Sequence, residues 1–255
     1  QENSEVPSIY SVANAQHTFG QRPFRAPHHT ASAIALVGGG SQPKPGEITL
    51  AHLGVLFLDE LPEFDRKVLE VLRQPLESKE IVISRAARQM TFPANFQFIA
   101  AMNPCPCGYA FNQDSRCQCS PENIQRYQNR ISGPLLDRID LHIDVPPLQT
   151  KELQDQSPTE SSTIVRQRVM KAYDKQMLRQ QCLNQVLSPN LLEQYAQLDE
   201  NSAKIIEMAQ QRLNLSARAY HRVLRVARTI ADLAESEIIS SSHLTEALSY
   251  RGHST

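Results

Sequence analysis

The sequence has no tryptophan, an aromatic content of 6% and almost no net charge, with a formal value of −1. Without an excess of one charge, no general field draws the chain to nucleic acid or acidic lipid, so such binding must come from local basic patches. No apolar run approaches the roughly 18 residues that a membrane-spanning helix needs. Residues 1–20 also lack the basic and then apolar order of a signal peptide. These absences predict a cytoplasmic protein with no membrane partner.

The phosphate-binding loop G-x-x-x-x-G-K-[ST] is also missing from the sequence. Glycines cluster at residues 38–47, GGGSQPKPGE, but no Gly-Lys-Ser/Thr follows them. The two prolines of this segment have no backbone N–H to offer to a phosphate. We therefore predict a turn or hairpin tip at this segment, and no complete nucleotide site within the chain.

Hydrophobic residues are abundant, at 40% of the 255 residues, which is enough for one large core or two smaller ones. In the first half of the chain, short apolar runs alternate with a helical pattern at 64–77. Strands separated by helices are typical of a parallel-sheet α/β layer. The predicted strands are 55–59, 80–84, 90–93, 96–102 and 139–145.

The composition of the chain changes near residue 148. Residues 146–163 are polar and contain three prolines and many hydroxyl side chains, which is typical of a linker. The remainder has helical periodicity, with Ser188 and Ser242 as predicted helix caps. We predict an α/β core at 1–147, a linker at 148–162 and a helical domain at 163–255. Its helices are expected at 163–178, 191–198, 203–213, 216–235 and 243–251.

Asp59 and Glu60 stand at the end of the apolar run VLFL. Every side chain of that run is apolar, as expected of a central parallel strand that is covered on both faces. Functional groups of open α/β sheets lie just beyond the carboxyl ends of such strands. One interpretation is an ATPase pair, in which Asp59 orders Mg²⁺ and Glu60 polarises the attacking water. The alternative is a pair of acids that favour the start of the next helix.

Asn103 follows another apolar strand, in the stretch FQFIAAMNP. On its own, this residue is best interpreted as the start of an Asn-Pro turn. If its strand neighbours the one before Asp59, however, Asn103 lies beside the two acids and can hydrogen-bond the water or a γ-phosphate. Arg138 precedes the last predicted strand, where a guanidinium can reach phosphates held by a neighbouring subunit.

Four of the five cysteines form two close pairs on one loop: Cys105, Cys107, Cys117 and Cys119. Disulfides are not expected in a reducing compartment, and four clustered thiolates suit a tetrahedral Zn²⁺. C-x-C pairs are less usual than C-x-x-C pairs, so reduced thiols remain the alternative. A catalytic zinc is not expected, because four thiolates leave no open position.

Arginines gather at two places. Arg85 and Arg88 fall between two strand-like runs, which predicts a hairpin with arginines at its tip, although arginines are also ordinary in solvated loops. The DNA-binding role open to such a tip is contact with phosphates. The second place is a stripe on a predicted helix, and such stripes are usually solvated faces. Its members are Arg218, Arg222, Arg225 and Arg228.

Two further features receive structural interpretations. Cys182 stands alone and is expected to be a small buried side chain. The pair His28-His29 is not expected to bind metal, because adjacent histidines point apart and no acid is near in the sequence.

Several longer stretches match one known family. GVLFLDELPEF, AAMNPCPCG, SGPLLDRIDL and SARAYHRVLRVARTIADL, with RPFRAPHHTAS and GGGSQPKPGEITLAHLG upstream, resemble the magnesium-chelatase-like ComM/YifB proteins. This family is a branch of the AAA+ ATPases related to chelatase and MCM helicase subunits. The resemblance runs from about residue 20 to 251. It implies an AAA+ parallel-sheet core, an all-α lid, and a hexameric ring with ATP at the subunit interfaces.

The resemblance also implies roles for individual residues. Asp59 and Glu60 match the Walker B acids, and Asn103 resembles sensor 1. Arg138 resembles the arginine finger that acts on a neighbouring subunit's nucleotide. Arg218 resembles the sensor 2 arginine of the lid.

The resemblance further implies DNA as a partner. The hairpin with Arg85 and Arg88 matches the pre-sensor-1 hairpin, whose tips point into the central pore of a ring. The family is associated with DNA remodelling, specifically branch migration during natural transformation. In the family, the phosphate loop precedes RPFRAPHH. The chain is therefore expected to begin after that loop, to hold half an active site and to be inactive alone.

Three functions remain open from the sequence. The first is a DNA-remodelling ring ATPase that uses ATP and Mg²⁺ and binds single-stranded or branched DNA. The second is an ATPase that drives Mg²⁺ into a porphyrin, and the third is a non-catalytic, zinc-bearing adaptor. An adaptor would have no need of the full set of Asp59, Glu60, Asn103 and Arg138. The arginine-tipped hairpin favours the DNA-remodelling enzyme.

Overall fold

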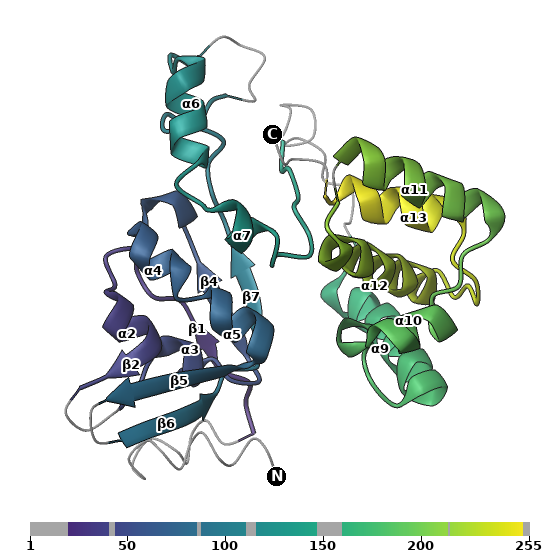
Figure 1. Cartoon of the computed structure of the whole chain (residues 1–255), viewed down its shortest axis with the longest axis horizontal. Helices are drawn as coiled ribbons and strands as arrows, with labels where there is room; N and C mark the ends of the chain where they lie inside the picture. Colours follow the sequence, from purple (N-terminus) through teal and green to yellow (C-terminus); the bar gives the residue numbers. More distant parts are fainter. Residues whose placement is uncertain are drawn as a thin grey trace. The chain divides into compact units, whose positions relative to one another are not determined.

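The computed structural model describes residues 20–40, 44–85, 88–110, 116–146, 160–213 and 215–251. Its packing divides into two units, Gln1–Ile139 and Asp140–Thr255 (Figure 1). The first unit ends before the predicted core end at residue 147. The predicted linker at 148–162 lies outside the described residues as far as residue 159. Ser161 then caps the next helix, which begins at Ser162.

The first unit contains a parallel three-stranded sheet in the order β1 (Phe24–Arg25), β4 (Val55–Leu58) and β7 (Gln97–Ala100). Along β4, Leu56 and Leu58 are fully buried, whereas Val55 and Phe57 are only partly buried. The predicted parallel α/β core is therefore confirmed. The prediction that both faces of this strand are covered is wrong for the described residues.

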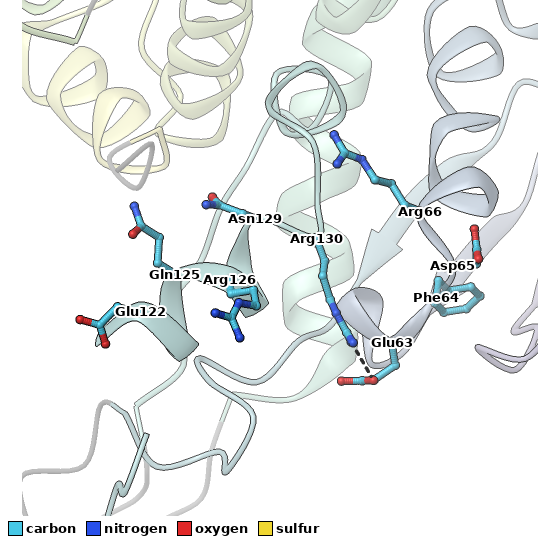
Figure 2. A pocket seen from close by; sticks show the side chains of 9 residues that line it. All are labelled: Glu63, Phe64, Asp65, Arg66, Glu122, Gln125, Arg126, Asn129 and Arg130. Atoms are coloured by element: carbon cyan, nitrogen blue, oxygen red, sulfur yellow. Dashed lines mark hydrogen bonds and ion pairs between the residues drawn. The ribbon is translucent and has the colours of Figure 1, made fainter. Parts of the chain in front are cut away.

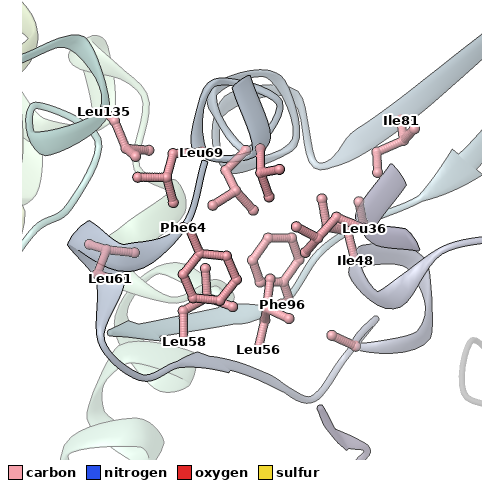
Figure 3. Packing of buried hydrophobic residues seen from close by; sticks show 14 of the residues in the cluster. Leu36, Ile48, Leu56, Leu58, Leu61, Phe64, Leu69, Ile81, Phe96 and Leu135 are labelled. Carbon is pink, nitrogen blue, oxygen red and sulfur yellow. The ribbon is translucent and has the colours of Figure 1, made fainter. Parts of the chain in front are cut away.

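The buried face of the sheet packs against short helices, whose apolar side chains fill the core shown in Figure 3. Leu36, Ile48 and Leu69 are at most 1% exposed. Each fully buried aliphatic side chain stabilises the fold by about 1.5–3 kcal/mol, so this cluster holds the helices on the sheet. The helices are α2 (Ala33–Val37), α3 (Glu47–Leu50), the 3₁₀ turn η3 (Leu61–Glu63), α4 (Arg66–Glu70) and α5 (Arg73–Ser78).

The single helix predicted at 64–77 is divided into α4 and α5. Pro75 explains the division, because its ring nitrogen has no hydrogen to donate to the carbonyl of Val71. Lys79 ends α5 in the left-handed conformation, with φ of 62°, and turns the chain into the next strand.

Two antiparallel hairpins belong to the first unit. β5 (Glu80–Arg85) pairs with β6 (Arg88–Pro93), so the predicted arginine-tipped hairpin is confirmed. The glycine segment forms the second hairpin, from β2 (Gly38–Gly39) and β3 (Lys44–Pro45), and residues 41–43 between them lie outside the described part. Gly38 has φ of 96°, and a Cβ atom there would collide with the Lys44 carbonyl oxygen.

The strand predicted at 139–145 is not formed, because residues 139–146 carry neither helix nor strand. The backbone N–H of His142 donates instead to the carbonyl of Tyr250 at 2.9 Å, so a helix end takes the place of a neighbouring strand. The apolar side chains of this segment, Leu141, Ile143 and Val145, are exposed. Two helices precede it, α6 (Pro121–Gln128) and α7 (Gly133–Leu136).

The second unit is a helical domain, as predicted. Val223, Ala227 and Ala231 of its central helix are fully buried. The last helix begins behind Ser240 instead of the predicted cap, Ser242. The helices are α9 (Ser162–Gln180), the 3₁₀ turn η4 (Asn184–Val186), α10 (Pro189–Tyr195), α11 (Glu200–Leu213), α12 (Ala217–Leu233) and α13 (Ser241–Ser249). Among the described residues, no helix has both the length and the apolar character that a membrane span requires.

The arginine stripe of α12 is not a solvated face, so this prediction is wrong for most of its members. Arg228 is 1% exposed and donates to two backbone carbonyls. Arg225 donates to the carbonyl of Leu187, and Arg222 pairs with Asp140 at 2.6 Å. The stripe faces the interior because its residues share the side of the helix that packs on the rest of the unit.

Candidate functional site

Asp59 and Glu60 lie exposed at the carboxyl end of β4. The backbone N–H of Glu60 donates to Oδ1 of Asp59 at 2.9 Å, and Glu60 has the left-handed angles φ 51° and ψ 46°. Glu60 stands at the N-cap position of the 3₁₀ turn η3 but makes no side-chain cap hydrogen bond, and Asp65 caps α4 through the N–H of Lys67 at 2.7 Å. The helix-start interpretation therefore holds for Glu60 by position at η3, and it is wrong for α4.

Asn103 follows β7, the strand that pairs in parallel with β4. Ala100 lies opposite Leu58, and the N–H of Ala101 donates to the Leu58 carbonyl at 2.9 Å. The N–H of Leu61 donates to the Ala101 carbonyl at 3.0 Å, which ties the two strand ends together. The predicted adjacency of the two strands is confirmed. The acids and the amide thus stand at the carboxyl ends of neighbouring strands, where ligands of α/β sheets bind.

His29 belongs to the same region, and sequence reasoning missed it. Its Nε2 lies 3.6 Å from Oε2 of Glu60, and its ring packs edge-on against Phe64 at a centroid distance of 6.4 Å. Glu60 thus lies near His29 in space, although no acid is near it in the sequence. The two histidine rings also lie against each other, with centroids 4.1 Å apart, so the expectation that they point apart is wrong. The pairing of the strands could have indicated this contact. His29 follows β1, and β1 pairs in parallel with β4, the strand that precedes the acids.

The acids and the amide fit a Mg²⁺ ion that carries a nucleotide. Mg²⁺ prefers hard oxygen ligands and keeps several waters, and the exposed carboxylates of Asp59 and Glu60 leave room for both. The chain has no Gly-Lys-Ser/Thr loop to hold the β- and γ-phosphates. The residues present therefore match the metal-and-water part of a nucleotide site.

Arg138 is held within the first unit. Its guanidinium donates to the Glu77 carboxylate and to the Pro134 carbonyl, both at 2.6 Å, and its side chain is 13% exposed. Arg218 is exposed in the first turn of α12, in the second unit.

Arg85 and Arg88 form the last pair of the β5–β6 ladder, and the side chains of residues 85–88 lie outside the described part. Ile81, Ile83 and Phe92, further from the tip, are buried in the core of the first unit. The core thus anchors one end of the hairpin, and the arginines occupy the other.

The four clustered cysteines converge, as predicted for a metal site. Sγ of Cys105 lies 3.3 Å from that of Cys107 and 3.8 Å from that of Cys117, and all four sulfur atoms lie within 4.8 Å of one another. Zn–S bonds of about 2.3 Å in a tetrahedron separate the sulfurs by about 3.8 Å, so the thiols fit a zinc ion. Cys119 is the fourth member of the cluster.

The thiols of this cluster differ in acidity. A hydrogen bond from the backbone N–H of Tyr109, together with the Cys105 thiol, lowers the pKa of Cys107 to about 6. A backbone contact with Cys107 lowers the pKa of Cys119, but the neighbouring thiols and burial outweigh it and raise that pKa to about 11. Four thiolates at this spacing repel one another, and a bound cation removes the repulsion.

An open pocket of about 630 Å³ lies between α6 and the segment that follows Glu60 (Figure 2). Arg130, just after α6, donates to Oε2 of Glu63 and to the Pro62 carbonyl, each at 3.0 Å. A smaller pocket of about 270 Å³ shares Glu63, Arg126 and Arg130 with it and reaches Cys119. The two pockets thus connect the cysteine cluster with the turn after the acids, whereas Asp59, Glu60 and Asn103 line neither.

Comparison with known families identifies the class of the chain. The family described as magnesium chelatase, subunit ChlI, matches residues 1–153, and the ChlI C-terminal family matches residues 159–251. The chain therefore belongs to the magnesium chelatase ChlI family. Its parallel-sheet core and helical C-terminal unit agree with an AAA+ fold that lacks some elements.

Individual relatives define the branch of this family. The chain is 52% identical to competence protein ComM of Haemophilus influenzae over 251 residues, which is 98% of this chain and 49% of that protein. It is 48% identical over 252 residues to the uncharacterized protein YifB of Escherichia coli, again 98% of this chain and 49% of that protein. The predicted resemblance to the ComM/YifB group is confirmed. The chain spans about half the length of these curated relatives.

Proposed function

We propose that the chain is part of an ATPase in which Asp59 holds Mg²⁺, Glu60 orients the attacking water and Asn103 hydrogen-bonds the γ-phosphate. The parallel pairing of β4 with β7 carries this proposal, because it brings the two acids and the amide to one edge of the sheet. Membership of the ChlI family supports the same class of activity.

Glu60 is the proposed proton acceptor. An ionised carboxylate accepts a hydrogen bond from the attacking water and then its proton as the bond to phosphorus forms. Its left-handed backbone is a strained conformation for a residue with a Cβ atom, and such strain clusters at functional sites. Mg²⁺, when bound, neutralises charge on the phosphate oxygens.

Two arginines are proposed to complete the site within a hexameric ring. A guanidinium stabilises the charge on a phosphoryl group during transfer. Arg138 would act on a neighbouring subunit's nucleotide, exchanging its contact with Glu77 for a phosphate. Arg218 would act from the helical unit as the lid arginine.

DNA, single-stranded or branched, is the proposed partner of the ring, and branch migration during natural transformation is the proposed outcome. The β5–β6 hairpin supports this proposal, because it carries Arg85 and Arg88 at its tip. The name of one relative, a competence protein, supports it independently. Insertion of Mg²⁺ into a porphyrin is the second candidate, and the family description supports it.

Hydrolysis in the presence of DNA separates these candidates. The chain has no phosphate loop, so alone it should bind ATP weakly and hydrolyse none above background. The assay therefore uses a longer protein that joins this chain to such a loop, at fixed salt because phosphate contacts are salt-dependent. We expect DNA to raise turnover. Turnover indifferent to DNA favours the porphyrin reaction, and robust hydrolysis by the chain alone overturns the assignment of the phosphate site.

The hairpin arginines have a direct test in the same assay. Replacing both, Arg85→Ala with Arg88→Ala, should remove the stimulation by DNA and leave basal turnover unchanged. Arg168→Ala is the matched control, because Arg168 forms an exposed ion pair with Glu160 in the helical unit. Equal stimulation of the double variant and the control would remove the hairpin from the DNA-binding surface.

A structural Zn²⁺ is the metal proposed for the four cysteines. Elemental analysis of purified protein should find about one zinc per chain, and replacing Cys105 and Cys117 by serine should abolish it. Cys182→Ser is the control and should retain the metal, since Cys182 lies in the helical unit. If purified protein contains no zinc and its cysteine pairs are still ordered, the four cysteines are reduced thiols and not a metal site.

A further inference from the structure

The segment between Asn103 and α7 connects the cysteine cluster to α6. Its residues 104–120, which we call the cysteine loop, contain all four clustered cysteines, and residues 111–115 of this loop lie outside the described part. Cys105 is two residues from Asn103, and Cys119 directly precedes Ser120, the cap of α6. A metal on these thiols therefore links the end of the Asn103 strand to the start of α6.

The far end of α6 is attached at two points. Nε2 of Gln128 donates to the carbonyl of Pro104 at 3.1 Å, which returns the helix to the beginning of the cysteine loop. Arg130 donates to the carbonyl of Pro62 and to the Glu63 carboxylate, each at 3.0 Å, and Figure 2 shows the contact with Glu63. Tyr127, which directly precedes Gln128, is 6% exposed. The helix is therefore fixed to the loop on one side and to η3 on the other.

The turn η3 in turn holds the backbone of Glu60. The N–H of Glu63 donates to the Glu60 carbonyl at 2.7 Å, and the N–H of Leu61 donates to the Ala101 carbonyl at 3.0 Å. A left-handed conformation is strained for a residue with a Cβ atom, and it persists only when its surroundings hold it. Arg130, which bonds the carbonyl of Pro62 within this turn, is one of those surroundings.

We propose that Arg130 is a positioning residue, which holds the Glu60 turn in place from α6, and that the metal on the cysteine loop holds α6. The proposal rests on the ATPase function assigned to Glu60 and on the zinc assigned to the cysteines. It assigns the loop a role in catalytic geometry: removal of the metal loosens the Glu60 turn, although no cysteine touches that turn. The Arg130–Glu63 pair is half exposed, so the Pro62 carbonyl is the main contact.

Hydrogen exchange of single amides tests this link on the 255-residue chain without ATP. Arg130→Ala should speed exchange of the Glu63 N–H about three- to tenfold, the range expected for the loss of one net hydrogen bond. Zinc removal by a chelator should do the same in the unchanged sequence. Arg130→Lys, which keeps the charge and a donor, should restore part of the protection.

Two controls show that a change is local. Arg126→Ala alters a neighbouring arginine of α6 that lines the same pocket, and it should leave the Glu63 amide unchanged. Exchange of the Ile83 amide, in the β5–β6 hairpin, should be the same in every variant. Fast exchange at both Glu63 and Ile83 would indicate general loss of structure and would overturn the proposed link.

The ATP turnover of the longer protein is a second measurement of the role of Arg130. Arg130→Ala should lower kcat and leave the KM for ATP unchanged, since Arg130 acts on the acid and not on the nucleotide. If the longer wild-type protein hydrolyses no ATP, or if it holds no zinc, the proposed function is refuted. The exchange rate of the Glu63 amide in Arg130→Ala still decides the role of Arg130 in that case. Unchanged exchange of Glu63 in Arg130→Ala, or in zinc-depleted protein, refutes the positioning role even if hydrolysis and zinc are both found.

Discussion

The acidic side chains singled out in the two units of this protein differ in burial. In the first unit, Asp59 and Glu60 stand exposed at the end of a strand. In the second, the Asp232 side chain is completely buried, with Arg228 at 3.0 Å and Arg179 at 2.6 Å. Exposed carboxylates can bind metal and water, whereas buried ones are already committed to their neighbours. We therefore expect the exposed carboxylates to act in binding and catalysis, and the buried carboxylate to stabilise the fold.

The energetics of the two regions should differ accordingly. Removing one partner of a buried ion pair leaves an uncompensated charge away from water, which costs several kcal/mol. Changing an exposed side chain usually alters the free energy of unfolding by less than about 0.5 kcal/mol. The same chemical change, from carboxylate to amide, should thus affect activity in one unit and stability in the other.

Glu60→Gln should produce the largest effect. Turnover of a protein that joins this chain to a phosphate loop should fall by about 10²–10⁴-fold, the usual contribution of a general base. The free energy of unfolding should change by less than about 0.5 kcal/mol, because the side chain is exposed. Turnover assays and urea unfolding measure the two quantities. A marked loss of stability would mean that Glu60 belongs to the fold, as Asp232 does.

Asp232→Asn should have the reverse effect, with a loss of about 3–5 kcal/mol of stability from the unpaired arginines. Glu235→Gln is the matched control in the same unit. Glu235 is exposed and pairs with Lys171 at 3.1 Å, so its replacement should cost about 1 kcal/mol or less. Urea unfolding followed by circular dichroism measures both variants. Equal losses would remove the distinction between buried and exposed pairs.

Low pH should reduce the stability of the helical unit, because it protonates Asp232. Burial raises the pKa of Asp232, but the hydrogen bonds from Arg179 and Asn184 and the charge of Arg228 hold that pKa below its ordinary value. A lowered folded-state pKa adds stability above the ordinary value of about 4, and this stability is lost as the pH falls through the folded-state pKa. Thermal melts at pH 6 and pH 3 should show the loss, and Asp232→Asn should depend less on pH over that window.

Ser161→Ala should produce the smallest effect. Ser161 caps α9 by accepting from the N–H of Ile164, and loss of such a cap costs about 1 kcal/mol. Ser162, the next residue, is exposed and makes no cap, so Ser162→Ala should change stability by less than about 0.5 kcal/mol. Chemical unfolding of both variants tests where the helical unit begins. A larger loss from Ser162→Ala would move that boundary.

Local patterns were sufficient where each element depends on its own residues. The run VLFL predicted β4, and two strand-like runs around Arg85 and Arg88 predicted the β5–β6 hairpin. Serine before a helical pattern predicted the cap of α10, Ser188. Four thiols at close spacing predicted a cluster because a short loop cannot separate them far.

Local patterns failed where a distant partner decides the outcome. Apolar and polar residues alternate at 139–145 as in a strand. The backbone N–H of His142, however, donates to the carbonyl of Tyr250 at a helix end and not to a neighbouring strand. The spacing of the α12 arginines is that of a solvated stripe. In the structure these arginines instead form ion pairs with Asp232 and Asp140 and a hydrogen bond to the carbonyl of Leu187. Residue spacing gives the direction of a side chain, and only packing decides whether that direction leads to solvent.

The sequence by itself determined the strand β4 and the acids after it, the arginine-tipped hairpin, the helical character of the second unit and the family of the chain, because these depend on residues adjacent along the chain. Tertiary structure alone decided three things: that His29 lies against Glu60, that Glu77 holds Arg138, and that Arg130 reaches the turn after the acids. Each joins segments separated by tens of residues, and such contacts form only when the parallel sheet and its core bring those segments together.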